Sequence, residues 1–172
     1  MRLAPFAVWA AQLRSDEDLF EAVRLYCLLT HSHELVVEAC YIYCYTIRYL
    51  ITSESCSPLD AYNKARDELE RRSVLTGISS IKYWFENEIE IDDVDEMPKA
   101  HERPVSYLKT PLLWAFYYLK HEYSLNRALK EMIMQGGDTS ANTAIVGGLI
   151  GASCGYHNID SDQIQRVLNV HQ

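Results

Sequence analysis

A glycine pair followed by an aspartate, Gly136-Gly137-Asp138, has the residue types and spacing best suited to ligand chemistry in this sequence. Glycines can adopt positive φ angles and let the backbone approach a ligand closely. Asp138 can cap the helix that follows, and the positive end of a helix dipole favours carboxylates and phosphates. The segment therefore predicts either a turn that binds an anionic ligand or simply the start of a tightly packed core helix.

The residues that follow Asp138 are small and mostly apolar as far as Ala152. Gly147, Gly148 and Gly151 carry almost no bulk, so a helix here has weak intrinsic propensity and must be held by close contact with its neighbours. The apolar run is too short to span a bilayer. We expect a buried helix packed closely against other elements.

This stretch resembles the C-terminal signature of the ADP-ribosylglycohydrolase family. The matching positions are Gly136, Gly137, Asp138, Thr139, Asn142, Ala144, Ile145, Gly147 or Gly148, and Gly151-Ala152. Three other segments are similar to segments of the same family: Met1-Arg2-Leu3-Ala4-Pro5, Leu29-Thr30-His31-Ser32-His33 and Leu113-Trp114-Ala115. The resemblance runs from residue 1 to about residue 160 and corresponds to the C-terminal half of the family's domain.

The resemblance implies hydrolysis of the bond between ADP-ribose and a protein side chain, or of a related ADP-ribose linkage. In the family, two Mg²⁺ or Mn²⁺ ions orient the ribose and position a water, and hard oxygen ligands suit these ions. Asp138 stands at the family's first metal-ligand position in this motif. Ser140 stands where the second aspartate is expected, and Ala141 stands where the family has a hydroxyl residue. The resemblance thus implies a vestigial metal site at Asp138 and Ser140.

The family's other metal ligands come from a Thr-Asp-Asp-Thr-like stretch in its N-terminal half, and no Thr-Asp-Asp triplet occurs in this sequence. A serine hydroxyl is a much poorer ligand than a carboxylate, and Asp138 alone cannot hold two divalent ions. We therefore expect no catalytic residue and no cofactor for the chain by itself. Mg²⁺ or Mn²⁺ would bind only if a complete site were assembled.

Six residues are candidate ligand-binding residues by the same resemblance: Arg2, His31, Gly136, Gly137, Thr139 and Asn142. The guanidinium fork of Arg2 suits a phosphate, and His31 could hydrogen-bond a phosphate or a ribose. A histidine that follows a helix end is also commonly a capping or surface residue, and that alternative stays open for His31.

Three functions are compatible with these residues. The first is a degenerate, non-catalytic half-domain that serves as a structural or interaction subunit, with a protein partner or larger assembly covering an exposed apolar face. The second is a Mg²⁺-dependent ADP-ribosyl hydrolase completed by another chain or by a longer gene product. The third is a protein that binds ADP-ribose or a nucleotide without cleaving it.

Charge and cysteine content narrow the classes of partner and compartment. The formal net charge of −8 argues against nucleic acid or an anionic membrane as the main partner, because both require clustered lysine and arginine. The five cysteines form no C-x-x-C pair, and no signal segment is evident at the N-terminus, so we expect an intracellular, reducing compartment, most simply the cytoplasm. Cys40 and Cys44 share a helix face and could bind a soft metal with a distant histidine, but buried free thiols are the simpler expectation.

The periodicity of apolar residues predicts an all-α, irregular multi-helix bundle that forms a single, partial domain over residues 1–172. A helix capped by Ser32 and covering Glu34–Ile51 is apolar on most sides, so it should lie at the centre. Helix 58–72, introduced by Ser57-Pro58, carries a charged face and should lie on the surface. The other predicted elements are helices over Phe6–Leu13, Asp16–Cys27 behind Ser15, Val74–Glu90, Leu112–Glu122, Leu125–Gln135 behind Ser124 and a final helix to Val170, with an extended segment over Val105–Thr110.

Overall fold

The computed structural model describes residues 2–77, 80–91, 93–102, 104 and 107–170. Of the described residues, 74% are helical and none lies in a strand, as the sequence predicts. The elements are α1 (Leu3–Ala10), α2 (Asp16–Leu28), α3 (Glu34–Thr52), α4 (Pro58–Thr76), α5 (Ser80–Trp84), the π-helical turn η1 (Phe85–Ile89), the 3₁₀ turn η2 (Val94–Glu96), α6 (Lys109–Lys120), α7 (Leu125–Met134), α8 (Thr139–Cys154), the 3₁₀ turn η3 (Tyr156–Asn158) and α9 (Ser161–Leu168).

Helix α3 forms the centre of one group of helices, as its all-round apolar sequence predicts. It packs against α1, α2, α4 and α8, and its residues from Val37 to Ile47 are buried without interruption. By length and composition alone α3 could cross a membrane, yet 61% of its apolar window is buried inside the bundle. A core helix surrounded by other helices is expected to have this composition.

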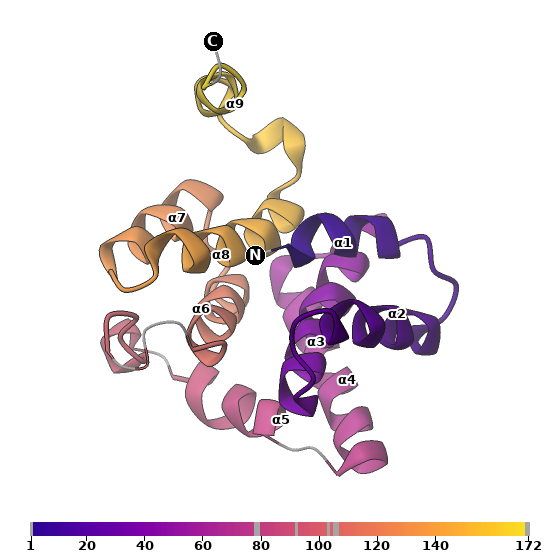
Figure 1. The fold of residues 1–172 in the computed structure, drawn as a ribbon. Helices are drawn as coiled ribbons and strands as arrows, with labels where there is room; N and C mark the ends of the chain where they lie inside the picture. The colour runs from indigo at the N-terminus through magenta and orange to yellow at the C-terminus, as the bar shows by residue number, and fades with distance from the viewer. Residues whose placement is uncertain (1, 78–79, 92, 103, 105–106, 171–172) are drawn as a thin grey trace.

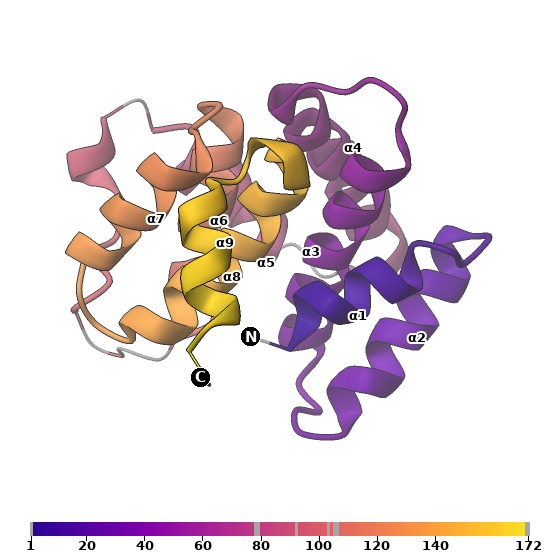
Figure 2. The ribbon, with the colours of Figure 1, turned by 90° about the horizontal axis from the view of Figure 1, so that it is seen from above.

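Helix α8 joins the α1–α4 group to a second group formed by α6 and α7, and Figures 1 and 2 show it lying between them. It packs along both α6 and α7 and also against α3. Close approach requires Gly148, because a Cβ atom there would lie 2.7 Å from the Cβ of Ala4 and closer still to the Tyr43 hydroxyl. That hydroxyl donates a hydrogen bond of 2.8 Å to the carbonyl of Ile145. The predicted close packing of this small-residue helix is confirmed, but its predicted burial holds for one face only, formed by Asn142, Val146, Leu149 and Ile150.

Of the serines predicted to cap helices, three are confirmed and Ser32 is wrong, and the Asp138 side chain makes no capping hydrogen bond. The side chains of Ser15, Ser57 and Ser124 each accept a hydrogen bond from a backbone N–H of the following helix, and Ser57 and Asp60 form a reciprocal capping box. Helix α3 is capped by His33 instead of Ser32, through a 3.1 Å bond from the Leu35 N–H to the imidazole Nδ1. A ring nitrogen can accept this bond as a serine oxygen does.

The prediction for α4 was wrong in its length and right for only part of its charged face, because Arg66, Glu70 and Arg71 are exposed whereas Glu68 and Arg72 are buried. The helix continues past Arg72 to Thr76 and ends where Gly77 adopts a φ of 72°, a left-handed cap that glycine favours. Arg72 is buried, and its guanidinium forms two hydrogen bonds of 2.6 and 2.8 Å with the Glu38 carboxylate of α3. One residue of the charged stripe, Arg72, thus forms a buried ion pair, while the rest of α4 keeps an exposed charged face.

Two prolines lie inside first helical turns, whereas the sequence predicts helices that begin just after them. Helix α1 runs over Leu3–Ala10 and includes Pro5, and α6 begins at Lys109, so Lys109 and Thr110 are helical. Proline is tolerated in a first turn because its missing N–H would have no intrahelical partner there. Residues 105–106 of the predicted extended segment lie outside the described residues.

The helix predicted over Val74–Glu90 is divided. Its first three residues complete α4, and a separate helix α5 begins at Ser80 and runs directly into η1. The tryptophan and phenylalanine at this junction, Trp84 and Phe85, are buried, so the apolar periodicity indicates the burial of this segment correctly.

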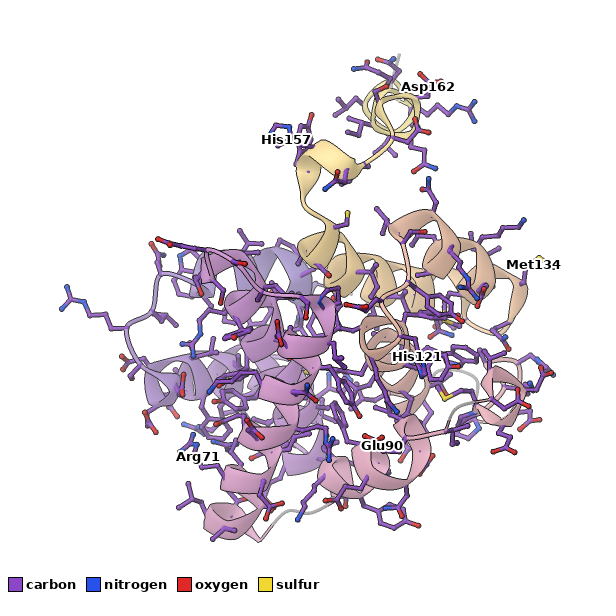
Figure 3. The ribbon with its side chains drawn as sticks, turned by 180° about the vertical axis from the view of Figure 1, so that it is seen from behind. Arg71, Glu90, His121, Met134, His157 and Asp162 are labelled. Carbon is purple, nitrogen blue, oxygen red and sulfur yellow. The ribbon has the colours of Figure 1, made fainter. Side chains whose placement is uncertain are left out.

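Helix α9 extends away from the rest of the molecule. Figure 3 shows His157 on η3 and Asp162 on α9 well separated from the helical body. None of the α9 residues is buried, and Val167 and Leu168 are largely exposed. The predicted last helix is present and is capped by Asp160.

Candidate ligand-binding pocket

A pocket of about 260 Å³ lies where the ends of several helices meet. It brings together four of the residues singled out from the sequence, Arg2, His31, Asp138 and Asn142, which lie far apart along the chain. Its other lining residues are Leu3, Tyr26, Cys27, Thr30, Val36, Cys40, Tyr107, Leu108, Pro111, Ala141 and Ile145. The wall is therefore largely apolar, with a few polar groups, as is usual for small-molecule sites.

Arg2 lies at the rim of this pocket and is held by the end of α2. Its Nη2 donates hydrogen bonds of 2.7 Å to the Thr30 hydroxyl and 3.2 Å to the Tyr26 carbonyl. The guanidinium also lies over the Tyr26 ring, 4.7 Å from its centroid, an arrangement that favours the cation. These contacts orient an exposed positive charge beside the pocket.

His31 is placed next to Arg2 by the turn between α2 and α3. The backbone N–H groups of Thr30 and His31 donate to the Cys27 carbonyl at 3.0 and 2.8 Å, which closes the last turn of α2. The His31 Nδ1 lies 2.8 Å from the Thr30 hydroxyl oxygen. Arg2 and His31 therefore share Thr30 as a partner, and both project groups suited to phosphate or hydroxyl oxygens.

Asn142 supplies a buried amide in the pocket wall. Only 2% of its surface is exposed, and its Nδ2 has no hydrogen-bond partner among the described residues. A buried donor left unpaired costs roughly 1–3 kcal/mol, so such groups usually bind a water or a ligand. The amide can donate to a carbonyl, hydroxyl or phosphate oxygen in the pocket.

Asp138 occupies the N-cap position of α8, and its carbonyl accepts the Asn142 N–H at 2.9 Å, but its side chain makes no capping hydrogen bond. It is the only acidic residue among the described residues that line the pocket. Ser140 is exposed and not part of that lining, and Ala141 offers no ligand atom. No group of three or more potential metal ligands occurs in the described part of the chain. These residues do not fit a dinuclear metal centre.

The glycine pair serves the chain's own packing. Gly136 and Gly137 both have positive φ, 72° and 69°, as the sequence suggests. A Cβ atom on Gly137 would collide with the Ala100 carbonyl, so the close approach here is to the protein's own backbone. Thr139 donates a hydroxyl hydrogen bond of 3.4 Å to the Gly137 carbonyl. The ligand-binding roles expected for Gly136, Gly137 and Thr139 find no counterpart in the pocket lining.

Sequence reasoning missed several pocket residues. Thr30 lies within the Leu-Thr-His segment that drew attention to His31, and its position between two candidates was an available signal. Tyr26, Cys27 and Cys40 come from helix faces whose convergence depends on how α2 and α3 pack, and no local pattern encodes that packing.

The family model described as ADP-ribosylglycohydrolase matches residues 1–172. The chain belongs to the ADP-ribosylglycohydrolase family. The all-α fold agrees with that membership. No curated protein and no solved structure matches the chain.

Proposed function

We propose that this chain is a non-catalytic member of the ADP-ribosylglycohydrolase family that acts as a structural or interaction subunit. The observation that carries the proposal is the composition of its pocket, where Asp138 is the only carboxylate among the described lining residues. The family's reaction requires two divalent ions, and each needs several oxygen ligands with enough negative charge to replace its water shell.

Ser140 and Ala141 leave the expected metal site beside Asp138 with less negative charge and fewer oxygen ligands than two divalent ions need. With Ser140 in place of the family's second aspartate, one negative charge is absent, and Ala141 adds no oxygen. Attraction between a dication and a carboxylate is worth several kcal/mol at short range in a protein environment. A single carboxylate cannot offset the repulsion between two dications held in one site.

Release of ADP-ribose from an ADP-ribosylated protein, with Mg²⁺ or Mn²⁺ present, tests this proposal directly. We expect the purified chain to give no release above the uncatalysed rate and to be indistinguishable from its Asp138→Ala variant. Metal-dependent turnover by the parent chain that disappears in the variant would contradict the proposal.

Exposed apolar side chains on α1 and α2 support a role in an assembly. The exposed residues are Val8, Trp9, Leu25, Leu28 and Leu29, with 45–71% of their surface accessible. Phe6 connects the two helices, because it stacks on Tyr26 at 4.3 Å and also contacts Trp9. Where exposed apolar side chains gather into a contiguous patch, they commonly mark an interaction site. Concentration-dependent sedimentation that Trp9→Ser abolishes would be the expected result, and a strictly monomeric chain that captures no partner would count against this role.

A second candidate function is favoured by the polar groups of the pocket. Arg2, His31 and the unpaired Asn142 amide could recognise ADP-ribose or a nucleotide without cleaving it, and none of the three requires a metal. Calorimetry with ADP-ribose should then show binding that Asn142→Ala weakens. If ADP-ribose gives neither heat nor a change in melting temperature, this candidate is excluded.

The remaining alternative is a hydrolase completed by another chain or by a longer product. Reconstitution with a chain that carries the missing Thr-Asp-Asp-type ligands, in the presence of Mg²⁺, would then restore release of ADP-ribose. Restored activity that depends on Asp138 would favour this alternative over the non-catalytic proposal.

A further inference from the structure

Two cysteines from neighbouring helices meet in the wall of the pocket. Cys27 lies in the last turn of α2 and Cys40 in the second turn of α3, and both line the pocket. Both are buried, with 4% and 6% of their surface exposed, on two helices that pack against each other, and each thiol affects the ionisation of the other. None of the functions proposed above involves either sulfur atom.

The two thiols differ in their readiness to ionise. The hydrogen bond from Cys40 and the nearby Arg2 charge lower the pKa of the Cys27 thiol below its ordinary value, although burial acts in the opposite direction. The same pairing, together with burial, raises the pKa of the Cys40 thiol. Cys27 is thus the thiol that ionises first and Cys40 is its protonated neighbour, which is the arrangement of attacking and resolving cysteines.

Cys27 is also connected to the polar rim of the pocket. Its carbonyl accepts the backbone N–H groups of both Thr30 and His31, and Thr30 in turn accepts a hydrogen bond from Arg2. Any shift of Cys27 toward α3 therefore moves the turn that carries these residues.

From this geometry we propose that Cys27 and Cys40 form a reversible, oxidant-sensitive thiol pair that closes into a disulfide between α2 and α3 in the pocket wall. The oxidant is a small hydroperoxide that can enter the pocket. The Cys27 thiolate attacks the peroxide oxygen, which breaks the O–O bond, forms a sulfenic acid at Cys27 and releases water or an alcohol. The Cys40 sulfur then attacks the Cys27 sulfur, the S–O bond breaks, and the departing hydroxide takes the Cys40 thiol proton and leaves as water while the disulfide forms.

The chain provides its own control for this inference. Cys44 lies one helical turn beyond Cys40, is fully buried, and does not line the pocket. Burial raises its pKa, so it should remain a thiol under the same treatment. Cys44→Ala is therefore the matched control for Cys40→Ala.

Peptide mapping of the full chain after hydrogen peroxide treatment tests the pairing. Trypsin leaves all three cysteines on one peptide, because no lysine or arginine lies between Arg24 and Arg48. A glutamate-specific protease separates Cys27 from Cys40 by cutting after Glu34 and Glu38. We expect two of the five cysteines to become unreactive toward an alkylating reagent added under denaturing conditions, the peptides containing Cys27 and Cys40 to be joined, and dithiothreitol to separate them.

The variants decide which sulfurs are involved. Cys44→Ala should retain the linked peptides, whereas Cys27→Ala and Cys40→Ala should lose them. If the folded parent chain keeps all its alkylatable thiols after peroxide treatment, or if the link persists in Cys40→Ala through Cys44, the proposal is overturned. Peptide mapping of the parent chain still tests for the linked peptides even if a cysteine variant fails to fold.

Discussion

The Asn142 side chain buries a hydrogen-bond donor in the pocket wall, which costs the folded chain stability and leaves that donor available to a ligand. Its amide is buried, and its Nδ2 is unpaired among the described residues, whereas the core around it is apolar. Arg2 and His31 differ, since each already has Thr30 as a protein partner. The unpaired donor of Asn142 is thus the single side-chain feature that most directly indicates a missing partner in the pocket.

Replacing Asn142 with alanine should affect ligand binding more than stability. Because the substitution removes a buried amide whose Nδ2 has no partner among the described residues, we expect the free energy of unfolding to change by less than about 1 kcal/mol. Leu149→Ala, a fully buried position on the same helix, should cost about 2–5 kcal/mol because it leaves a cavity. Urea unfolding of both variants measures the contrast. A loss of stability in Asn142→Ala as large as that in Leu149→Ala would show that the amide is structural.

The chemical character of these residues could be predicted from the sequence, but their proximity in space could be predicted only in part. The resemblance identified Arg2, His31, Asp138 and Asn142, and the structure brings all four to one pocket. It could not show that Gly137 approaches the Ala100 backbone, because that contact depends on a segment far earlier in the chain. Nor could the periodicity of the sequence predict the ion pair between Arg72 and Glu38, since a charged helix face usually indicates exposure to solvent.

Among the helices, the packing of α8 decides where Asp138 and Asn142 lie. Gly148 contacts α1 and α3 through Ala4 and Tyr43, whereas a Cβ atom added to Gly151 on the same helix would have no neighbouring atom within 4 Å. The two glycines have the same intrinsic cost to the helix but face different surroundings.

Alanine substitutions at these glycines should therefore have opposite effects. Gly148→Ala should destabilise the protein by about 1–3 kcal/mol, because the added methyl group must displace Tyr43 or Ala4. Gly151→Ala should stabilise it by up to about 1 kcal/mol, because alanine restricts the unfolded chain and favours the helix. Thermal or urea unfolding of both variants makes the comparison. Equal effects of the two substitutions would contradict the packing described for α8.

Helix boundaries were the least predictable part of the fold. The order of the helices, the central place of α3 and most of the caps could be predicted from the sequence, because these depend on local periodicity and capping side chains. The positions of Pro5 and Pro111 within their helices and the break between α4 and α5 could not, since tertiary contacts decide whether a helix continues past a weak signal.

Across the whole molecule, the core contains ionisable groups that must stay neutral. Burial raises the pKa of Tyr45 to about 12, and it also raises the pKa values of Tyr41, Tyr62 and Cys44 above their ordinary values. Neutral forms of these groups are therefore favoured by folding. Their ionisation at alkaline pH must oppose the folded state.

Stability should consequently fall on the alkaline side. Below the ordinary pKa values, near 9 for cysteine and 10 for tyrosine, folded and unfolded chains hold the same protons and the contribution is constant. Above them the unfolded chain loses protons that the folded chain keeps, so each group lowers the free energy of unfolding by about 1.4 kcal/mol per pH unit. Urea midpoints that decline between about pH 9 and pH 11 are expected. Midpoints that are constant over that range would be inconsistent with buried, neutral tyrosines.

The proposed lack of catalysis depends on the number of divalent ions that this family member can hold. Titration of the purified chain with Mn²⁺, followed by calorimetry or by the paramagnetic signal of the free ion, counts the bound ions directly. We predict no tightly bound pair and the same weak background for the parent chain and for Asp138→Ala. Two Mn²⁺ ions bound per parent chain, and lost in Asp138→Ala, would show that the pocket holds a dinuclear centre and that the proposed function is wrong.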